Sequence, residues 1–256
     1  MADIIKIEKG NADSVLRLFE NNECHWPALL ENAFKYGRVS ADDAASPTVA
    51  AAFISGCVLF AGDSESKNAE AVIRSFPALP LALPTQTRWL DAVRKVYGDA
   101  AKSVTRYRLS DESIDVEILN ELDLSVEEGF EIKRVDLAIA QKMQDALGVE
   151  YHLRHYDSLE QFVELGRGHV VTHGDELCTV TAAFLQTGCE IEIQTNTAER
   201  YRRRGFALKT AAATVMDCVY KDVTVCWDAG NTISRDLAKK LGYTECEEYE
   251  CIEYFP

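Results

Sequence analysis

The sequence predicts an α/β fold, in which helices flank a mixed and mostly antiparallel sheet. Three apolar runs separated by glycine-containing turns predict an antiparallel meander over residues 169–172, 178–185 and 189–195. Further along the chain, residues 206–220 carry apolar side chains at helical spacing, and residues 222–227 have the pattern of a buried strand. Strands that alternate with helices after a meander are typical of a layered α/β domain.

The first half of the chain shows a comparable alternation. We expect helices over residues 12–20, 26–36, 68–76 and 87–97, and strands over residues 48–54, 57–61, 103–109 and 114–118. Ser55-Gly56 lies between the first two strands and predicts a hairpin turn. Pro77, Pro80 and Pro84 are expected to interrupt regular structure before the fourth helix.

Residues 121–129 are the best candidate for a linker between domains. They are acidic and turn-prone, and they lie between two regions that have a regular apolar pattern. We therefore expect an N-terminal α/β domain over residues 1–125 and a second domain over residues 126–256.

The second domain is expected to begin with a strand over residues 130–135 and a helix over residues 137–146. Asp157 or Ser158 has the side chain of a helix cap and predicts the start of another helix. The last predicted helix ends at Gly242, because glycine readily adopts the left-handed backbone that follows many helices. One or two closing strands follow it.

The chain is acidic, with 42 acidic and 27 basic side chains in 256 residues and a net charge of −15. This charge repels a polyphosphate backbone, so we expect no nucleic-acid partner. The N-terminus lacks a basic segment followed by a long apolar stretch, and the other apolar runs are strand-sized or interrupted. We expect a cytoplasmic protein that has no membrane partner.

Eight cysteines are scattered along the chain without C-x-x-C spacing. In a chain of this length without a signal peptide, reduced thiols are the preferred interpretation. His152 and His155 are three residues apart and could share a helix face, but no third metal ligand is evident. We therefore expect no metal.

A basic island stands out in this acidic chain: Arg200-Tyr201-Arg202-Arg203-Arg204, followed by Gly205 and a predicted helix. The pattern Arg202-x-x-Gly205-x-Ala207 places small residues where the backbone must turn tightly. The unpaired N–H groups of the first helical turn can hold a pyrophosphate. The sequence therefore contains a candidate anion cradle.

Taken alone, this pattern is short, and an ordinary helix start with basic surface residues is the preferred interpretation. It lacks the Gly-Lys-Ser/Thr ending of a phosphate-binding loop of nucleotide hydrolases and the further glycines of a dinucleotide-binding turn. Phosphoryl transfer and hydride transfer therefore lose support.

A second block follows about twenty-five residues later: Trp227-Asp228-Ala229-Gly230-Asn231, and then Leu237-Ala238-Lys239-Lys240-Leu241-Gly242-Tyr243. The ordered pair of blocks resembles the GNAT family of acyl-CoA-dependent N-acetyltransferases, over roughly residues 130–256. The residues of these blocks, together with Glu190-Ile191-Glu192-Ile193, resemble those of a subgroup that includes the zwittermicin A resistance acetyltransferase. The first half also resembles that subgroup's leading domain, and it is open whether this half is a degenerate copy of the GNAT fold.

The resemblance implies a coenzyme A site, and because the first half has no counterpart of the Arg202-x-x-Gly205-x-Ala207 loop, we expect one such site per chain. The loop at Arg202 would hold the pyrophosphate, Asn231 would contact the pantetheine arm, and the backbone near Gln194 would pair with its amides like an added strand. The cofactor-binding residues expected on this basis are Gln194, Thr195, Thr197, Arg202, Arg203, Arg204, Gly205, Phe206, Ala207, Asn231 and Ser234.

Acyl transfer to an amine needs a base, because the amine is protonated in water. Glu190 and Glu192 alternate with Ile191 and Ile193, so both carboxylates should project from one face of a strand. An ordinary solvent-facing strand would explain them equally well, although Glu192 lies directly before the cofactor loop. Asp228 is a further candidate base, or a cap of the next helix.

The sequence leaves open which group is the general acid that protonates the departing thiolate. Many relatives carry a tyrosine on the last helix, where this chain has Ala238. A thiolate of pKa about 8.5 is a tolerable leaving group, so water, Tyr201 or Tyr243 could supply the proton. Tyr243 is expected rather to pack after Gly242.

The resemblance thus implies an N-acetyltransferase with acetyl-CoA as co-substrate, acting by direct transfer on a primary amine of a small molecule or peptide. The acidic surface favours a cationic acceptor, and the N-terminal domain is expected to help to shape its site. A non-catalytic acyl-CoA-binding or sensing module is the alternative. The sequence does not determine the acceptor, the acyl-chain length or the oligomeric state.

Overall fold

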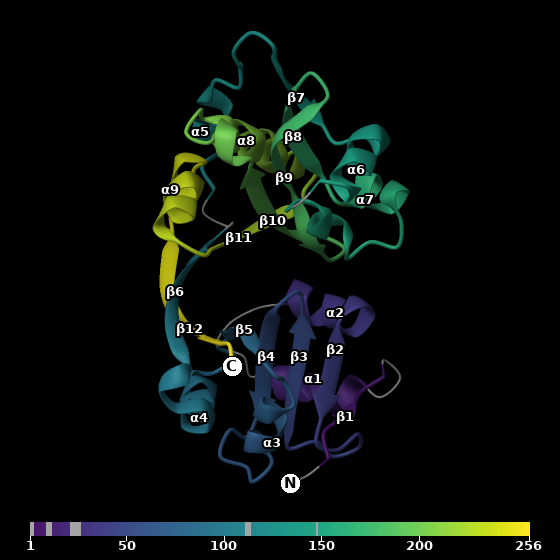
Figure 1. Ribbon diagram of the computed structural model, residues 1–256, viewed down its shortest axis with the longest axis vertical. Helices are drawn as coiled ribbons and strands as arrows, with labels where there is room; N and C mark the ends of the chain where they lie inside the picture. The colour runs from purple at the N-terminus through teal and green to yellow at the C-terminus, as the bar shows by residue number, and fades with distance from the viewer. Residues whose placement is uncertain (1–2, 9–11, 21–26, 111–113, 147) are drawn as a thin grey trace. The chain divides into compact units, whose positions relative to one another are not determined.

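The computed structural model describes residues 3–8, 12–20, 27–110, 114–146 and 148–256 (Figure 1). The chain divides into two compact units: residues 1–106 with 249–256, and residues 107–248. The second unit begins earlier than the expected boundary near residue 125. Residues 107–109 already pair with a strand of that unit, and Leu119 is buried in its core.

The first unit contains a six-stranded sheet. Its elements are β1 (Ile5–Lys6), α1 (Ala12–Phe19), α2 (Pro27–Tyr36), β2 (Arg38–Ala41), β3 (Val49–Ile54), β4 (Cys57–Gly62), α3 (Ala69–Arg74), β5 (Leu79–Leu83), α4 (Thr87–Tyr97), η2 (Gly98–Ala100) and the end of β12 (Cys246–Tyr254). Strands β1 to β4 are antiparallel, β5 is parallel to β4, and β12 is antiparallel to β5.

The predicted hairpin is confirmed. Ser55 and Gly56 both have positive φ, at 48° and 88°, and Ile54 pairs directly with Cys57. Two consecutive residues of positive φ twist the turn in the sense that an antiparallel hairpin requires. The residues of β5 were expected to be irregular because of their prolines. They form a strand nevertheless, in which Leu81 N–H donates to the Gly56 carbonyl (3.0 Å).

The second unit contains the end of β6 (Lys102–Leu109), α5 (Val116–Glu121), β7 (Phe130–Arg134), α6 (Leu137–Gln144), η4 (Glu150–Leu153), α7 (Leu159–Leu165), β8 (Gly168–His173), β9 (Glu176–Gln186), β10 (Glu190–Thr197), η5 (Glu199–Tyr201), α8 (Phe206–Val219), β11 (Thr224–Ala229), α9 (Thr232–Lys240) and the start of β12. From β7 to β12 the α-helices and strands repeat the order found from β1 to β6. Strands β7 to β10 are antiparallel, β11 is parallel to β10, and β6 is antiparallel to β11. The predicted mixed, mostly antiparallel sheet flanked by helices is confirmed.

The last strand of each repeat is exchanged. In sequence β6 follows α4, yet it pairs with β11 in the second unit, at Trp227↔Leu109 through Ala229↔Tyr107. Likewise β12 follows α9 and pairs with β5 in the first unit, at Ile252↔Ala82. Each sheet is therefore completed by a strand from the other half of the sequence.

Helices cover both faces of the second sheet. Val180 and Ala182 of β9 are buried with residues of α6 and α7, whereas Ala183 is buried with residues of α8. Because successive strand residues point to opposite faces, α8 lies on one face and the α6–α7 pair on the other. In Figure 1 these helices also appear on different sides of the strands. The region between β10 and α8 is thus fixed by a packed core.

One predicted strand is wrong. Residues 114–118 were expected to be extended, but α5 covers Val116–Glu121. The Asp115 side chain accepts hydrogen bonds from the N–H groups of Glu117 (3.0 Å) and Ile118 (3.4 Å). This N-cap satisfies donors that a helix otherwise leaves unpaired, and it outweighs the β-propensity of the isoleucines. Of the expected linker, residues 121–129, Glu121 is the last residue of α5, whereas residues 122–129 lie in no helix or strand; all of them belong to the second unit.

Candidate functional site

Strands β10 and β11 pair only at their beginning. The parallel pairing covers Glu190↔Thr224, Ile191↔Val225 and Glu192↔Cys226, and then it ends. Beyond this point, within the part of the chain that the structure describes, β10 pairs with β9 alone and β11 pairs with β6. We call this point the fork. The β10 edge that faces β11 from Ile193 to Thr197 therefore presents backbone N–H and C=O groups that no strand ladder in the described part of the chain satisfies.

A β-bulge lies at the fork. Glu192 pairs with Leu185 and Ile193 pairs with Ala183, so Phe184 of β9 is the extra residue. His155 Nδ1–H donates to the Phe184 carbonyl (2.9 Å), and the two rings meet edge to face at 5.2 Å. A bulge bends its strand and frees backbone groups from the ladder, and bulges are common next to functional sites.

The Glu192 carboxylate lies at the fork. Its Oε1 accepts a hydrogen bond from the backbone N–H of Asp228 on β11 (3.2 Å). Ile191 and Ile193 are buried in the core with α8, while Glu190 and Glu192 are half-buried. The alternation predicted for these four residues is therefore present, and Glu192 is the carboxylate that reaches across to β11.

Asp228 is a residue of β11 and not a helix cap. Its Cα is opposite Arg108 of β6. The cap of α9 is Asn231, whose Oδ1 accepts from the N–H of Ser234 (2.9 Å). The Ser234 hydroxyl in turn accepts from Trp227 Nε1 (3.1 Å). Asn231 and Ser234 thus have structural partners, and both lie in the first turn of the helix that follows the fork.

The loop before α8 has the backbone expected for an anion cradle. Arg203 and Gly205 have positive φ, at 62° and 79°. Lys209 N–H donates to the Gly205 carbonyl (3.2 Å), so the N–H groups of residues 206–208 lie ahead of the first helical hydrogen bond. An added Cβ at Gly205 would meet only Lys209 Cε, at 4.0 Å. Glycine is therefore required here by the left-handed backbone and not by lack of space.

The side chains of this loop have different surroundings. Arg202 Nε donates to the Thr197 carbonyl (3.3 Å), which connects the loop to the end of β10. Arg204 is bound by Glu127, and Phe206 is a core residue with 1% of its surface exposed. Ala207 is half-buried in the first turn of α8. The structure thus brings the predicted residues together, but two of their side chains point into packed surroundings.

Buried threonines connect β10 to α8. Thr181 of β9 shares hydrogen bonds with the hydroxyls of Thr195 (2.9 Å) and Thr210 (2.8 Å). The hydroxyl of Thr179 donates to that of Thr197 (3.2 Å). The side chains of Thr195 and Thr197 are thereby engaged with β9. Gln194, between them and the fork, has an exposed side chain.

Many relatives carry a tyrosine acid at the position that Ala238 occupies here. Tyr201 and Tyr243, the two tyrosines considered as the acid instead, lie elsewhere. Ala238 is fully buried in the core. Tyr243 is buried, and its hydroxyl donates to the Val225 carbonyl (2.9 Å). The Tyr201 hydroxyl donates to Glu176 Oε2 (2.8 Å). Both hydroxyl protons are therefore held by other groups, as expected for packing residues.

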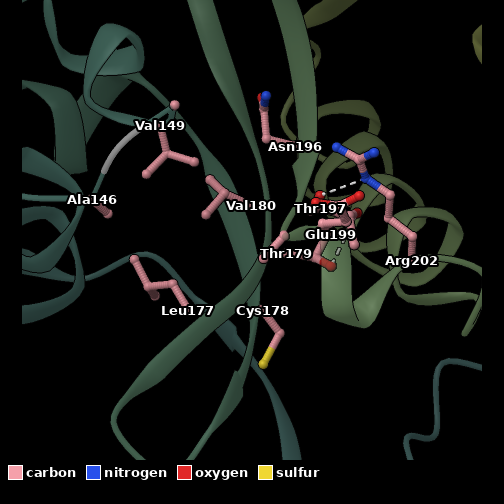
Figure 2. A pocket seen from close by; sticks show the side chains of 12 residues that line it. Ala146, Val149, Leu177, Cys178, Thr179, Val180, Asn196, Thr197, Glu199 and Arg202 are labelled. Atoms are coloured by element: carbon pink, nitrogen blue, oxygen red, sulfur yellow. Dashed lines mark hydrogen bonds between the residues drawn. The ribbon is translucent and has the colours of Figure 1, made fainter.

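A pocket of about 250 Å³ lies beside the end of β10 (Figure 2). One wall is apolar, with Ala146, Val149 and Val180. The opposite wall carries Asn196 and Arg202. Figure 2 shows the Arg202 guanidinium group bonded to the Thr197 backbone on that polar wall. The pocket thus adjoins the loop before α8, on the α6 face of the sheet.

Sequence reasoning missed a buried polar cluster next to this pocket. The Tyr151 hydroxyl donates to Asn196 Oδ1, and the Tyr151 and His152 rings stack at 4.6 Å. Burial lowers the pKa of His152 to about 4, against weaker opposing effects of Asn196 and nearby backbone. Burial likewise raises the pKa of Tyr151. The 152/155 spacing had suggested only a shared helix face, whereas the contact with Asn196 depends on the tertiary fold.

The model of the GNAT acetyltransferase family matches residues 16–252. This match covers both repeats and most of the chain. The chain belongs to the GNAT acetyltransferase family. Membership places this GNAT protein among the acyltransferases. No curated protein was similar enough to count as a match.

Solved structures share the fold of this GNAT protein over nearly its full length. A GCN5-related N-acetyltransferase-like protein from Streptococcus suis is 26% identical, with a TM-score of 0.82, covering 96% of this chain and 99% of the other. A GNAT acetyltransferase from Colwellia psychrerythraea is 11% identical (TM-score 0.58; 99% and 100% covered). A tandem GNAT protein from the clavulanic acid biosynthesis pathway is 12% identical (TM-score 0.60; 98% and 96% covered).

Two further observations concern the described residues of this GNAT protein. No three His, Cys, Asp or Glu side chains there gather as a metal ion would need, and each described cysteine is a free thiol. No described helix combines the length and apolar character needed to cross a bilayer.

Proposed function

We propose that the chain is an acetyl-CoA-dependent N-acetyltransferase that moves an acetyl group directly to a primary amine. The observation that carries the proposal is the fork: pairing between β10 and β11 ends at Glu192, next to a loop that has the backbone of an anion cradle. An extended ligand with amide groups and a pyrophosphate at one end fits both parts. Family membership supports the same reaction class.

The residues that would hold the coenzyme follow from this geometry. The backbone N–H groups of residues 205–208 and the N-terminal end of the α8 dipole would receive the pyrophosphate. The open edge of β10, including Gln194, would pair with the pantetheine amides as an added strand would. Asn231, in the turn after β11, would contact the same arm through the amide NH₂ that its cap leaves available.

Acetyl-CoA supplies an activated thioester when it is bound. The chain's own contribution is to remove a proton from the acceptor amine, and Glu192 is the group that we assign to this step. Its carboxylate is held at the fork by the Asp228 N–H, so it accepts the proton directly or through a water that it orients. Because Tyr201 and Tyr243 donate elsewhere, water supplies the proton to the departing thiolate.

The acceptor is proposed to be a cationic small molecule or peptide. The net charge of −15 attracts such an amine at long range and repels nucleic acid and anionic lipid surfaces. Membership in the subgroup of the zwittermicin A resistance acetyltransferase remains part of this proposal and would make an amino-containing antibiotic a suitable first acceptor for a screen.

A non-catalytic acyl-CoA sensor is the second candidate. It is favoured by one observation, that Ala238 occupies the helix position at which a tyrosine acid was expected. A sensor would bind acetyl-CoA but release no free thiol with any amine in the screen. Turnover with any acceptor decides for the enzyme.

The first experiment is calorimetric titration with acetyl-CoA, using Gly205→Asp and the matched variant Gly205→Asn. Asp and Asn are similar in size, and both tolerate left-handed backbone better than other residues, so the two variants share any strain. Asp adds a negative charge where the pyrophosphate should lie. We expect binding by the parent, weaker binding by Gly205→Asn, and none by Gly205→Asp. A parent that does not bind acetyl-CoA refutes both the enzyme and the sensor.

A further inference from the structure

The charges of the arginine run are not equivalent. Arg200 forms an ion pair with Glu176, and Arg204 forms one with Glu127 (2.6 Å). Arg202 and Arg203 have exposed side chains and, among the residues that the structure describes, no ion-pair partner. The run therefore consists of two neutralised cations and two that are available to an anion.

Arg204 is held from two sides. Its Nε and Nη2 donate to the two carboxylate oxygens of Glu127, at 3.0 and 2.6 Å. Its guanidinium lies 4.3 Å from the ring centroid of Phe130 and 5.0 Å from that of Phe206. The pair raises the pKa of Arg204 and lowers that of Glu127. Bidentate pairing combined with stacking on rings fixes the guanidinium plane more firmly than a single surface contact does.

Glu127 belongs to a segment that is attached to α8 at further points. We call residues 122–128 the strap. Leu122 and Leu124 pack against the core that contains α8, and Val126 packs against the cluster that contains Phe206. Lys209 Nζ donates to the backbone carbonyl of Asp123 (2.7 Å). The strap thus holds residues 204 and 209, which lie on either side of the first turn of α8.

We propose that Arg204 is a positioning residue, which together with Glu127 holds the loop before α8 against the strap. Of the arginine run, only the side chains of Arg202 and Arg203 then contact the phosphates of the ligand. This inference rests on the proposed acetyl-CoA site. A carboxylate beside an anion site weakens the site by charge alone. Glu127 therefore opposes binding electrostatically and favours it only by keeping the loop in its binding conformation, so that less order is lost when the ligand binds.

The experiment compares the variants Glu127→Gln, Arg204→Met and the double variant, with Glu128→Gln as the control. Glu128 is the exposed neighbour of Glu127 and, within the described residues, forms no ion pair. Its variant therefore makes the same charge change without altering the contact between Glu127 and Arg204, which we call the clamp. We expect Glu127→Gln to weaken acetyl-CoA binding roughly three- to tenfold, which lies in the lower part of the range of measured pair couplings. The double variant should be no weaker than Arg204→Met, and Arg203→Gln should add its own loss to either.

Charge alone predicts the opposite sign. If Glu127→Gln binds acetyl-CoA more tightly, or as Glu128→Gln does, the positioning role is refuted. If the parent does not bind acetyl-CoA, the proposed function is refuted. Amide hydrogen exchange of residues 203–208 then tests whether the clamp, the contact between Glu127 and Arg204, orders the loop. Faster exchange in Glu127→Gln than in Glu128→Gln supports it, and equal exchange overturns it. Should Arg204→Met not fold, the comparison of the two glutamine variants is sufficient.

Discussion

The backbone N–H of Asp228 donates to the carboxylate of Glu192 across the point at which β10 and β11 stop pairing. The separation of the two strands is thus bridged by the Glu192 side chain. A carboxylate held in this way has a fixed position relative to the open edge of β10. General-base catalysis requires such positioning before any adjustment of proton affinity.

Glu192→Gln should lower kcat by roughly 10²-fold or more, the usual contribution of a general base. Its amide can still accept the Asp228 N–H, so the affinity for acetyl-CoA should stay near that of the parent. Steady-state kinetics and calorimetry measure the two quantities, and Glu190→Gln, on the same strand face, is the matched control. Parent-like turnover by Glu192→Gln would remove Glu192 from the chemistry.

Asn231 is expected to have two separable roles. Asn231→Ala should lower the free energy of unfolding by about 1 kcal/mol, because it removes the cap of α9. Asn231→Ser retains a capping oxygen but lacks the amide NH₂, so stability should be kept while acetyl-CoA affinity falls. Denaturant unfolding and calorimetry distinguish the roles. Full affinity in the serine variant would show that the amide does not touch the coenzyme.

Tyr243→Phe should affect stability and not catalysis. It removes the buried hydrogen bond to the Val225 carbonyl and leaves that acceptor unsatisfied, at a cost of about 1–3 kcal/mol. Turnover at a temperature where the variant is folded should equal that of the parent. A selective loss of kcat in a fully folded variant would instead support Tyr243 as the acid. Tyr201→Phe, which loses its bond to Glu176, is the comparison.

His152 should make stability depend on pH. Its pKa is about 4 in the fold and about 6.5 when unfolded, so the unfolded chain binds more protons between these values. The contribution of His152 to the free energy of unfolding is therefore fully present above pH 6.5. It is lost as the pH decreases toward 4, and it amounts to at most ~3 kcal/mol. His152→Phe should flatten that decline. An imidazole NMR titration in the parent gives the same test: a His152 resonance that titrates near 6.5 contradicts it.

Much of the second unit could be predicted from its sequence, because local patterns there agree with the fold. The meander, the helix at Phe206 and the last helix before Gly242 follow from apolar spacing and glycine turns. Strand β5 could not be predicted in this way. Its residues include Pro80, and it becomes a strand only because β4 and β12 pair with it from distant parts of the chain.

The residues of the candidate site also fall into those that a local sequence pattern predicts and those that only the tertiary fold reveals. Gly205 and Asn231 carry backbone requirements that a sequence displays, namely a left-handed turn and a helix cap. The partners of Arg204 and Asn196 do not appear in any local pattern, since Glu127 and Tyr151 lie 77 and 45 residues away. From the sequence alone, an arginine beside a turn glycine is interpreted as a phosphate ligand, and only the fold shows which carboxylate neutralises it.

The exchange of β6 and β12 determines when each half of the protein can be completed during synthesis. A ribosome delivers β5, which ends at Leu83, long before it delivers β12, which begins at Cys246. Until then one edge of the first sheet lacks its neighbour, and unpaired strand edges invite pairing with other chains. The nascent first half is consequently the stage at which a chaperone has most to protect, and a premature stop before β12 leaves that edge open permanently.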